Sequence, residues 1–383
     1  MTIFRVTVVI RLLVAGAMLL AGGKVLAAPP AGVPIVIGQT LPLTGLQHHK
    51  AASMIMAGVN AQVRHINANG GIKGRPLRVV TLDDENDPAK HVQNLRRLIQ
   101  QEKAVAIINC LGDRLCRLTA ETASAFQVPL IGPLSGAHFP RGPAERYVFR
   151  VRPEYAREAE VLARQMATMG VGNVALITQS ELETAQVPVL KDVFKQAGLV
   201  LTAIELKTQE RTAINNLLRV IDTGKFDAAI LDFSPDILIT LNQGDFGRRP
   251  EWPGLIASLS GPSVPLLAST FPGRTFAFTM VVPNPESAAI PLVREFVTHA
   301  ERHDAGPEAI SHAGFEAYIN TRICVEALRR AQDPLSPKGV ASALESLRTY
   351  DLGGFQLNLR EDQRSASNWV DVGVVSKAGF FLD

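Results

Sequence analysis

A short segment after the expected strand 105–108 concentrates residues that could do chemistry. Cys110 and Cys116 enclose the segment, and Asp113 and Arg114 lie between them. A guanidinium group holds a carboxylate through two parallel hydrogen bonds and stays charged at any relevant pH, so Arg114 could bind an acidic ligand. The alternative is an Arg114 that pairs with Asp113 or points into solvent. The segment is therefore a candidate ligand-binding loop.

The N-terminus has the pattern of a secretory signal peptide. Arg5 and Arg11 precede an uncharged apolar run, residues 12–23, which is too short to span a bilayer and is followed by small residues. We expect cleavage after Ala27, which would remove residues 1–27 and place the mature chain in the periplasm; Ala28 is the alternative site, which Pro29 disfavours. No cysteine follows closely, which argues against a lipid anchor. No second apolar stretch is long enough to insert the mature chain into a membrane.

Three cysteines in an exported protein allow one disulfide bond. Cys110 and Cys116 are six positions apart, so a bridge would hold the loop between them. The other interpretation is two separate small buried side chains. Cys324 lies in an amphipathic segment beside Tyr318 and Leu328, which predicts a core position rather than a catalytic one.

The composition is that of a soluble globular chain. With 20% charged and 46% hydrophobic residues over 383 positions, the chain can bury large cores, and its length suggests two lobes. The formal charge is only +3, with acids and bases interspersed, which argues against nucleic acid as a partner. Two tryptophans and 6% aromatic residues also disfavour a sugar receptor.

Strands and helices alternate with short turns from residue 34 onward, a rhythm that favours parallel sheets covered on both faces. A first series of expected strands spans 35–38, 77–82, 105–108 and 128–131. The rhythm restarts after Pro153 with helices at 158–169, 189–197 and 213–223 and strands at 173–178, 200–205, 227–231 and 275–282. Later helices are expected at 290–303, 312–331 and 337–347. The sequence therefore predicts an α/β protein with two doubly wound parallel-sheet lobes.

The segment 66–88, INANGGIKGRPLRVVTLDDENDP, reads as a helix end, a glycine turn, a strand and an acidic turn. It resembles the first lobe of the branched-chain amino-acid-binding (Leu/Ile/Val-binding) proteins, the type 1 periplasmic solute receptors of ABC importers. Later stretches are similar to this family too: VVPNPESAAIPLVREF, GFEAYINTRICVEALRRA, LESLRTYDLGGFQLNL and WVDVGVVSKAGFF. The resemblance covers essentially the whole mature chain.

The resemblance implies the type 1 periplasmic binding protein fold, in which three crossovers form a hinge between the lobes. Lobe 1 would comprise residues 28–150 and 283–354, and lobe 2 residues 151–282 and 355–383. The implied partners are a small-molecule ligand in the interlobe cleft and the membrane permease subunits of an ABC transporter. We expect a monomer without a cofactor or a metal. Paired histidines at 48 and 49 could suggest a metal, but no companion ligand spacing appears.

Ligands of open α/β sheets bind outside the carboxyl ends of strands, so the site should consist of loops. The turn P-L-T-G at 42–45 matches the family and leads to Lys50 at the expected cleft edge. Family receptors for amino acids hold the ligand α-carboxylate with small hydroxyl residues in the loop that here carries Asp113 and Arg114. The G-P-x-[ST]-G-A turn is retained and places Leu134, Ser135 and Gly136 at the site; ordinary turn chemistry is the alternative.

The opposing lobe departs most from the family pattern. Glu183 lies near the position of a tyrosine in relatives, and Asp232 and Phe233 replace a glycine and aromatic loop. Ser260 lies near the place where an acidic residue contacts the ligand ammonium in amino-acid receptors. Glu183 or Asp232 could supply that carboxylate instead, but both could equally be solvated loop charges. A ligand with a carboxylate but no α-ammonium would therefore suit Arg114 and Lys50 better than leucine would.

The sequence thus favours a periplasmic solute-binding component of an ABC importer. Alternatives are an extracytoplasmic sensor for a receptor kinase and, less favoured, a periplasmic enzyme. The chain lacks G-x-G-x-x-G after its first strand, a G-x-S-x-G elbow and Cys/His metal spacing. The acidic run Asp83 to Asp87 resembles a cation site, but a turn that starts a helix before Pro88 explains it more simply.

Overall fold

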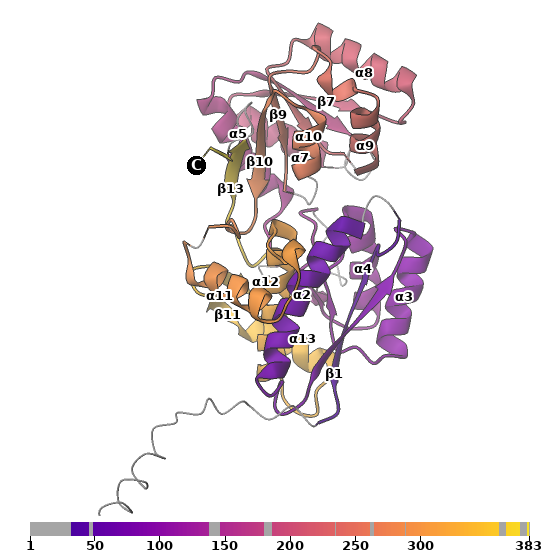
Figure 1. Cartoon of the computed structure of the whole chain (residues 1–383), viewed down its shortest axis with the longest axis vertical. Helices are drawn as coiled ribbons and strands as arrows, with labels where there is room; N and C mark the ends of the chain where they lie inside the picture. Colours follow the sequence, from indigo (N-terminus) through magenta and orange to yellow (C-terminus); the bar gives the residue numbers. More distant parts are fainter. Residues whose placement is uncertain are drawn as a thin grey trace, which may run out of the picture.

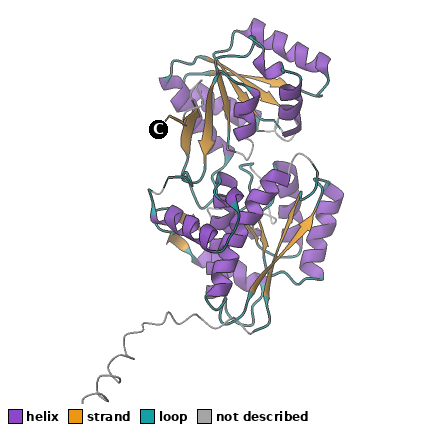
Figure 2. Cartoon of the chain, viewed as in Figure 1, coloured by secondary structure: helices purple, strands orange, loops and turns teal. Residues whose placement is uncertain are grey.

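The structure is a computed structural model. It describes residues 32–45, 49–137, 146–179, 186–233, 235–260, 264–287, 289–359, 365–375 and 381–382. Two α/β lobes lie one above the other along the long axis of the molecule (Figure 1). Helices flank the strands of each lobe (Figure 2). The predicted α/β class with two sheets is confirmed.

The first lobe contains a five-stranded parallel sheet in the order β2-β1-β3-β4-β5. Its strands are β1 (Ile35–Leu41), β2 (Leu77–Asp83), β3 (Ile107–Ile108), β4 (Leu130–Ile131) and β5 (Val148–Phe149). One face packs on α2 (His49–Ala68), α11 (Pro291–Arg302), α12 (His312–Arg330) and α13 (Pro337–Ser346). The other face packs on α3 (Pro88–Gln100) and α4 (Asp113–Ala125).

The second lobe contains a seven-stranded sheet in the order β14-β13-β10-β9-β8-β6-β7. Its strands are β6 (Asn173–Thr178), β7 (Val200–Glu205), β8 (Ala228–Leu231), β9 (Leu255–Ser258), β10 (Thr275–Met280), β13 (Asp371–Val375) and β14 (Phe381–Leu382). One face packs on α5 (Tyr155–Thr168) and α7 (Val187–Gln196), the other on α8 (Arg211–Gly224), α9 (Pro235–Gln243) and α10 (Val264–Thr270). Strand β13 runs antiparallel to both of its neighbours, β10 and β14, so this sheet is mixed rather than all parallel.

Short elements complete the fold. They are the hairpin β11 (Arg348–Asp351) and β12 (Gln356–Leu359) and the 3₁₀ turns η2 (Phe246–Arg248) and η3 (Pro307–Ala309). Phe355, Leu357 and Ala366 belong to the core of the first lobe. The chain enters the second sheet at β13, after Ala366. The lobe boundary expected at residue 355 stays a prediction.

Two of the connections between the lobes run side by side. Arg150 and Ser365 form a parallel bridge. Ala366 N donates to Arg150 O at 2.9 Å, and Ser367 N donates to Val151 O at 3.0 Å. The strip that leaves β5 and the strip that leads to β13 are thus joined by backbone hydrogen bonds. We call this pair the hinge ribbon.

Helix α2 illustrates how the sequence builds the first lobe. Its buried face includes Ile55, Val59, Val63 and Ile66, as the helical spacing predicts. The face packs against α12, and the contact is very close at Gly58. A Cβ atom there would lie 1.8 Å from the carbonyl oxygen of Gly314. Only a glycine at this crossing lets the two helix backbones approach so closely.

Three histidines gather where α2 meets α11. The rings of His65 and His299 stack with their centroids 3.5 Å apart, and the His303 ring lies 5.7 Å from His65. The Tyr318 hydroxyl lies 2.9 Å from Nδ1 of His299. Burial and the two neighbouring histidines lower the pKa of His299 to about 4, from an ordinary value of 6.5. Burial also lowers the pKa of His65 and His303.

We expect acid to destabilise the protein through this cluster. Between pH 6.5 and about 4 the unfolded chain protonates His299 while the folded chain does not, so the stability present above pH 6.5 is lost as the pH falls. His299 alone would account for up to about 3 kcal/mol. Unfolding free energies at several pH values in wild type and His299→Gln test this. A pH dependence that is the same in both proteins would contradict it.

Candidate ligand-binding site

Loops from both lobes meet at the first residues of α5. Tyr155 N donates to Gly136 O in the loop after β4 at 2.8 Å, and the Tyr155 hydroxyl reaches Asp113 after β3 at 3.1 Å. From the other lobe, Ser260 after β9 hydrogen-bonds through its backbone N–H to Glu158 at 2.8 Å. These loops follow the carboxyl ends of parallel strands, where ligands of α/β sheets bind. We call the junction the interlobe site.

Asp113 is oriented by two hydroxyl groups. Ser135 Oγ donates to Asp113 Oδ1 at 2.6 Å, and the Tyr155 hydroxyl donates to the same oxygen. Burial raises the pKa of Tyr155 well above its ordinary value, and Asp113 adds to the rise, so the phenol keeps its proton. Ser135 is fully buried, and its Oγ also accepts from Ala137 N at 3.1 Å. The hydroxyl of Ser135 is therefore used within the protein.

Gly136 is required by the Tyr155 ring. A Cβ at this position would lie 2.5 Å from Cδ1 of the ring. The backbone of the loop after β4 therefore packs directly on the phenol that orients Asp113. This close approach is the physical reason for a glycine between Ser135 and Ala137, beyond its use in a turn.

A buried ionic network joins the lobes behind Tyr155. Arg152 Nη2 lies 3.4 Å from Oε1 of Glu158 on α5, and Arg152 Nε lies 3.6 Å from Oε1 of Glu316 on α12. Arg152 also contacts the hydroxyl of Ser260, and Thr279 donates to Glu158 at 2.6 Å. All three charged residues are at most 6% exposed. Arg152 therefore links an acid of each lobe.

Burial shapes the protonation of this network. Burial raises the pKa of Glu316, and the nearby Glu158 raises it further, while Arg152 opposes the rise. For Arg152, burial alone would lower the pKa, but Glu316 and Glu158 raise it above its ordinary value. The guanidinium thus stays charged and compensates acids that would otherwise be isolated in the protein interior.

The structure brings together only some of the residues expected at the site. Four of them lie around Tyr155 and Arg152: Asp113, Ser135, Gly136 and Ser260. The sequence did not predict Tyr155 and Arg152 as site residues. Their positions, at the start of α5 and on the crossover before it, were the available indication of a site. Their partners are far away in the sequence, however, so pattern alone could not assign them.

The remaining expected residues have different surroundings. Leu134 is buried in the core of the first lobe, and Phe233 is half-buried against the core of the second. Asp232 is exposed, yet its charge contributes to the raised pKa of Tyr155. Lys50 and Arg114 are exposed near the starts of α2 and α4. Glu183 lies outside the described residues, as does His48.

Cys110 and Cys116 form a disulfide bond with Cα atoms 5.3 Å apart. Both side chains are fully buried, so the first turn of α4, which carries Asp113, is held to the end of the segment after β3. Cys324 is buried in α12, and burial raises its pKa to about 12, which fits the expected core role. In the described ranges, no group of three or more His, Cys, Asp or Glu could hold a metal ion.

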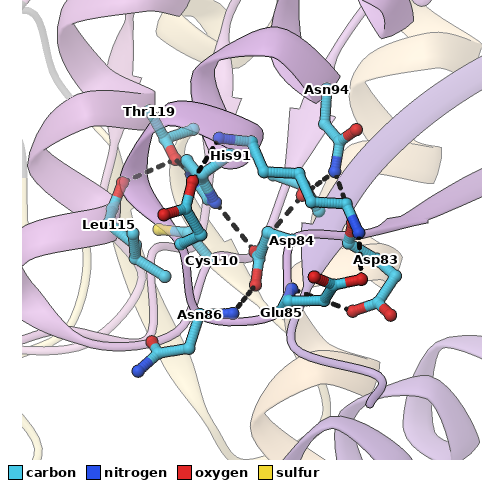
Figure 3. A network of polar contacts seen from close by, with 12 residues as sticks. Asp83, Asp84, Glu85, Asn86, His91, Asn94, Cys110, Leu115 and Thr119 are labelled. Atoms are coloured by element: carbon cyan, nitrogen blue, oxygen red, sulfur yellow. Dashed lines mark hydrogen bonds and ion pairs between the residues drawn. The ribbon is translucent and has the colours of Figure 1, made fainter. Parts of the chain in front are cut away.

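A chain of Asp84, His91 and Thr119 has the order of groups found in hydrolase triads (Figure 3). His91 Nδ1 lies 2.8 Å from Asp84, and His91 Nε2 lies 2.7 Å from Thr119 Oγ1. All three residues are completely buried, and Thr119 donates to Leu115 O at 2.9 Å. A substrate cannot reach a hydroxyl placed in this way. These hydrogen bonds instead connect the acidic turn after β2 to α4.

The acidic turn itself starts a helix, as the sequence predicted. Asp87 is the N-cap of α3, and its side chain accepts from Lys90 N at 2.7 Å. Asp83 accepts from the Thr44 hydroxyl at 2.6 Å, and Asp84 accepts from Asn86 N at 2.9 Å. The carboxylates of Asp83, Asp84 and Asp87 thus accept hydrogen bonds from the protein itself, and this accounts for the cluster of acids in the turn.

Two α/β lobes with loops meeting at a shared junction define the class of two-lobed solute receptors. A family model described as periplasmic binding protein matches residues 34–379, so the chain belongs to this family. Among the described residues, no helix is both long and apolar enough to cross a membrane.

Solved structures share the fold across nearly the whole chain. A possible leucine/isoleucine/valine-binding protein from Rhodopirellula baltica superposes with a TM-score of 0.77, at 20% identity over 93% of this chain and 98% of that one. A solute-binding protein from R. palustris in complex with 4-hydroxybenzoate has a TM-score of 0.72, at 15% identity over 90% and 93%. Identities this low show the fold alone.

Curated relatives match over shorter stretches. The chemotactic signal transduction system substrate-binding protein BasB of Halobacterium salinarum is 29% identical over 139 residues, which is 35% of this chain and 34% of that protein. An amino acid binding protein of Pseudomonas aeruginosa is 34% identical over 74 residues, 19% of this chain and 20% of that protein. The matched stretches thus span about a third or less of these relatives.

Proposed function

We propose that this chain is the periplasmic solute-binding component of an ABC importer of the branched-chain amino-acid type. It binds a small organic solute between its two lobes. The sequence leads us to expect an amino acid or a simple carboxylate. The observation that carries the proposal is the interlobe site, where Asp113 of the first lobe and Ser260 of the second converge on the start of α5. Membership of the periplasmic binding protein family supports the same role.

The mechanism needs no reaction. A ligand that touches both lobes binds the closed arrangement better than the open one, so it shifts the population toward closure. The hinge ribbon carries the motion, and Arg152 stays paired with Glu158 and Glu316 next to it. Membrane permease subunits would then distinguish the closed, liganded form from the empty one.

A second role is that of a ligand sensor. One observation favours it specifically: the relative from Halobacterium salinarum belongs by name to a chemotactic signal transduction system. The binding step would be the same, and the receiver of the closed form would be a receptor instead of a permease.

A ligand screen tests the proposed function. The mature chain from Ala28 is melted with amino acids, aromatic and aliphatic acids, dicarboxylates and amines, and each hit is examined by small-angle X-ray scattering. A specific ligand at a hundredfold excess over Kd should add about 2.7 kcal/mol of stability. It should also reduce the radius of gyration, because the lobes close. If every class fails to stabilise the protein, or stabilises it without compaction, the proposal is wrong.

The same screen tests the sequence-based expectation for Arg114. If a carboxylate is held by this guanidinium, Arg114→Ala should weaken its binding by roughly tenfold or more, as expected for a charge-assisted hydrogen bond. Arg219→Ala on α8 is the control, since Arg219 is also exposed but lies on a helix outside the interlobe site. Equal binding by the two variants would remove Arg114 from the site.

A further inference from the structure

Asp113 has one oxygen in use and one open. Oδ1 accepts from both Ser135 and Tyr155, whereas no described residue donates to Oδ2. The side chain is half-buried, so water solvates the carboxylate less well than at an exposed surface. Two hydroxyls and a fixed loop hold the carboxylate in place. It is therefore an oriented acceptor with spare capacity.

The surrounding charges do not neutralise Asp113. Arg152 is a buried cation within electrostatic reach of Asp113, and it is shared between Glu158 and Glu316. Asp232 of the second lobe adds another negative charge within electrostatic reach of Tyr155. Arg114 follows Asp113 directly, but its side chain is exposed and forms no ion pair with a described residue. Among the described residues, Asp113 therefore forms no ion pair of its own.

An anion is disfavoured at this place for a second reason. The Ser135 hydroxyl, which could have donated to a ligand carboxylate, donates to Asp113 instead. Tyr155 does the same with its only proton. A carboxylate placed beside them would meet the open Oδ2 of Asp113 rather than a hydrogen-bond donor. Two carboxylates in contact repel each other strongly where water is partly excluded.

We propose that the ligand presents a positively charged nitrogen, such as an ammonium or amidinium group, to Oδ2 of Asp113, next to the phenol of Tyr155. This inference rests on the proposed function, because it names the ligand class of the same site, and within that function it replaces the simple carboxylate by a ligand with a cationic nitrogen. The ligand then supplies the cationic partner that no described residue gives to Asp113.

Pairs of ligands with matched shapes test the charge preference. Isothermal calorimetry compares 3-methylbutylamine with 4-methylpentanoate, and benzylamine with phenylacetate. Putrescine and benzamidine extend the cationic set. We expect at least one amine or amidine to bind at least tenfold more tightly than the matched acid. Raising NaCl from 50 to 500 mM should weaken this binding in the wild-type protein, a measurement that needs no variant.

Variants locate the contact. Asp113→Asn keeps the shape and removes the charge, and it should weaken binding of the cationic hit at least tenfold. Glu121→Gln makes the same charge change at an exposed position of α4, so it should leave binding within twofold. Binding that is insensitive to both Asp113→Asn and salt overturns the inference.

The outcomes also separate the two proposals. If acids or zwitterionic amino acids bind more tightly than amines and compact the protein, the solute-binding function stands and the cationic ligand class is wrong. If no compound of any charge binds, the proposed function fails and this inference falls with it.

Discussion

Replacing Arg152 by methionine is expected to lower the free energy of unfolding by about 3–5 kcal/mol. Methionine keeps much of the length of the side chain but leaves Glu158 and Glu316 facing each other without a cation. Both acids are buried, one on each lobe. An uncompensated buried charge is far more costly than a lost surface pair, because the low-polarity interior cannot solvate it.

Urea titration measures this loss through the transition midpoint. Arg164→Met is the control, since Arg164 pairs with Glu160 on the exposed face of α5 and should cost no more than about 1 kcal/mol. Adding Glu316→Gln to Arg152→Met should recover part of the loss, because one of the two isolated charges disappears. A loss below about 1 kcal/mol in Arg152→Met would mean that the network contributes little.

Gly58→Ala is the second substitution with a large expected effect. In an ordinary helix the change from glycine to alanine stabilises by roughly 0.5–1 kcal/mol. Here the new Cβ would overlap the Gly314 carbonyl oxygen at 1.8 Å, so α2 and α12 must separate. Overpacking of this kind costs about 1–3 kcal/mol and more where rigid backbones must move. We expect a net loss of about 3 kcal/mol.

A matched glycine provides the control for this prediction. Gly339 lies in the first turn of α13, and a Cβ there meets only the Ser336 hydroxyl at 3.2 Å. Gly339→Ala should therefore change stability by less than about 1 kcal/mol in either direction. Thermal melts of both variants suffice. Equal stability of the two variants would show that the helix crossing adjusts without cost.

Much of the fold follows from local patterns. The strands 173–178 and 200–205 were predicted with their observed bounds, because they are apolar or β-branched runs between clear turns. Strand β9, Leu255–Ser258, was missed. It has four residues and is stabilised by pairing with β8 and β10, which a single segment does not reveal. The antiparallel direction of β13 is likewise set by tertiary pairing.

The site was predictable only in part, for a related reason. Asp113 begins α4 shortly after β3, and Ser135 and Gly136 stand in the loop after β4. Topology alone brings such segments at the carboxyl ends of strands together. Whether a charge is solvated or buried depends on partners far away in the chain. Arg152 pairs with Glu316, but the stretch of sequence between them forms most of the second lobe and part of the first. No local sequence pattern could therefore indicate this pair.

The hinge ribbon limits the ways in which the lobes can move. Two strips joined by the bonds Ala366 N to Arg150 O and Ser367 N to Val151 O bend easily across their thin direction. Sliding or twisting would instead pull these donors away from their acceptors. Three independent linkers would let the empty protein explore many relative orientations, and each would have to be given up on closure. A ribbon leaves fewer relative orientations open to the empty protein, so the proposed closure around a ligand would cost less entropy.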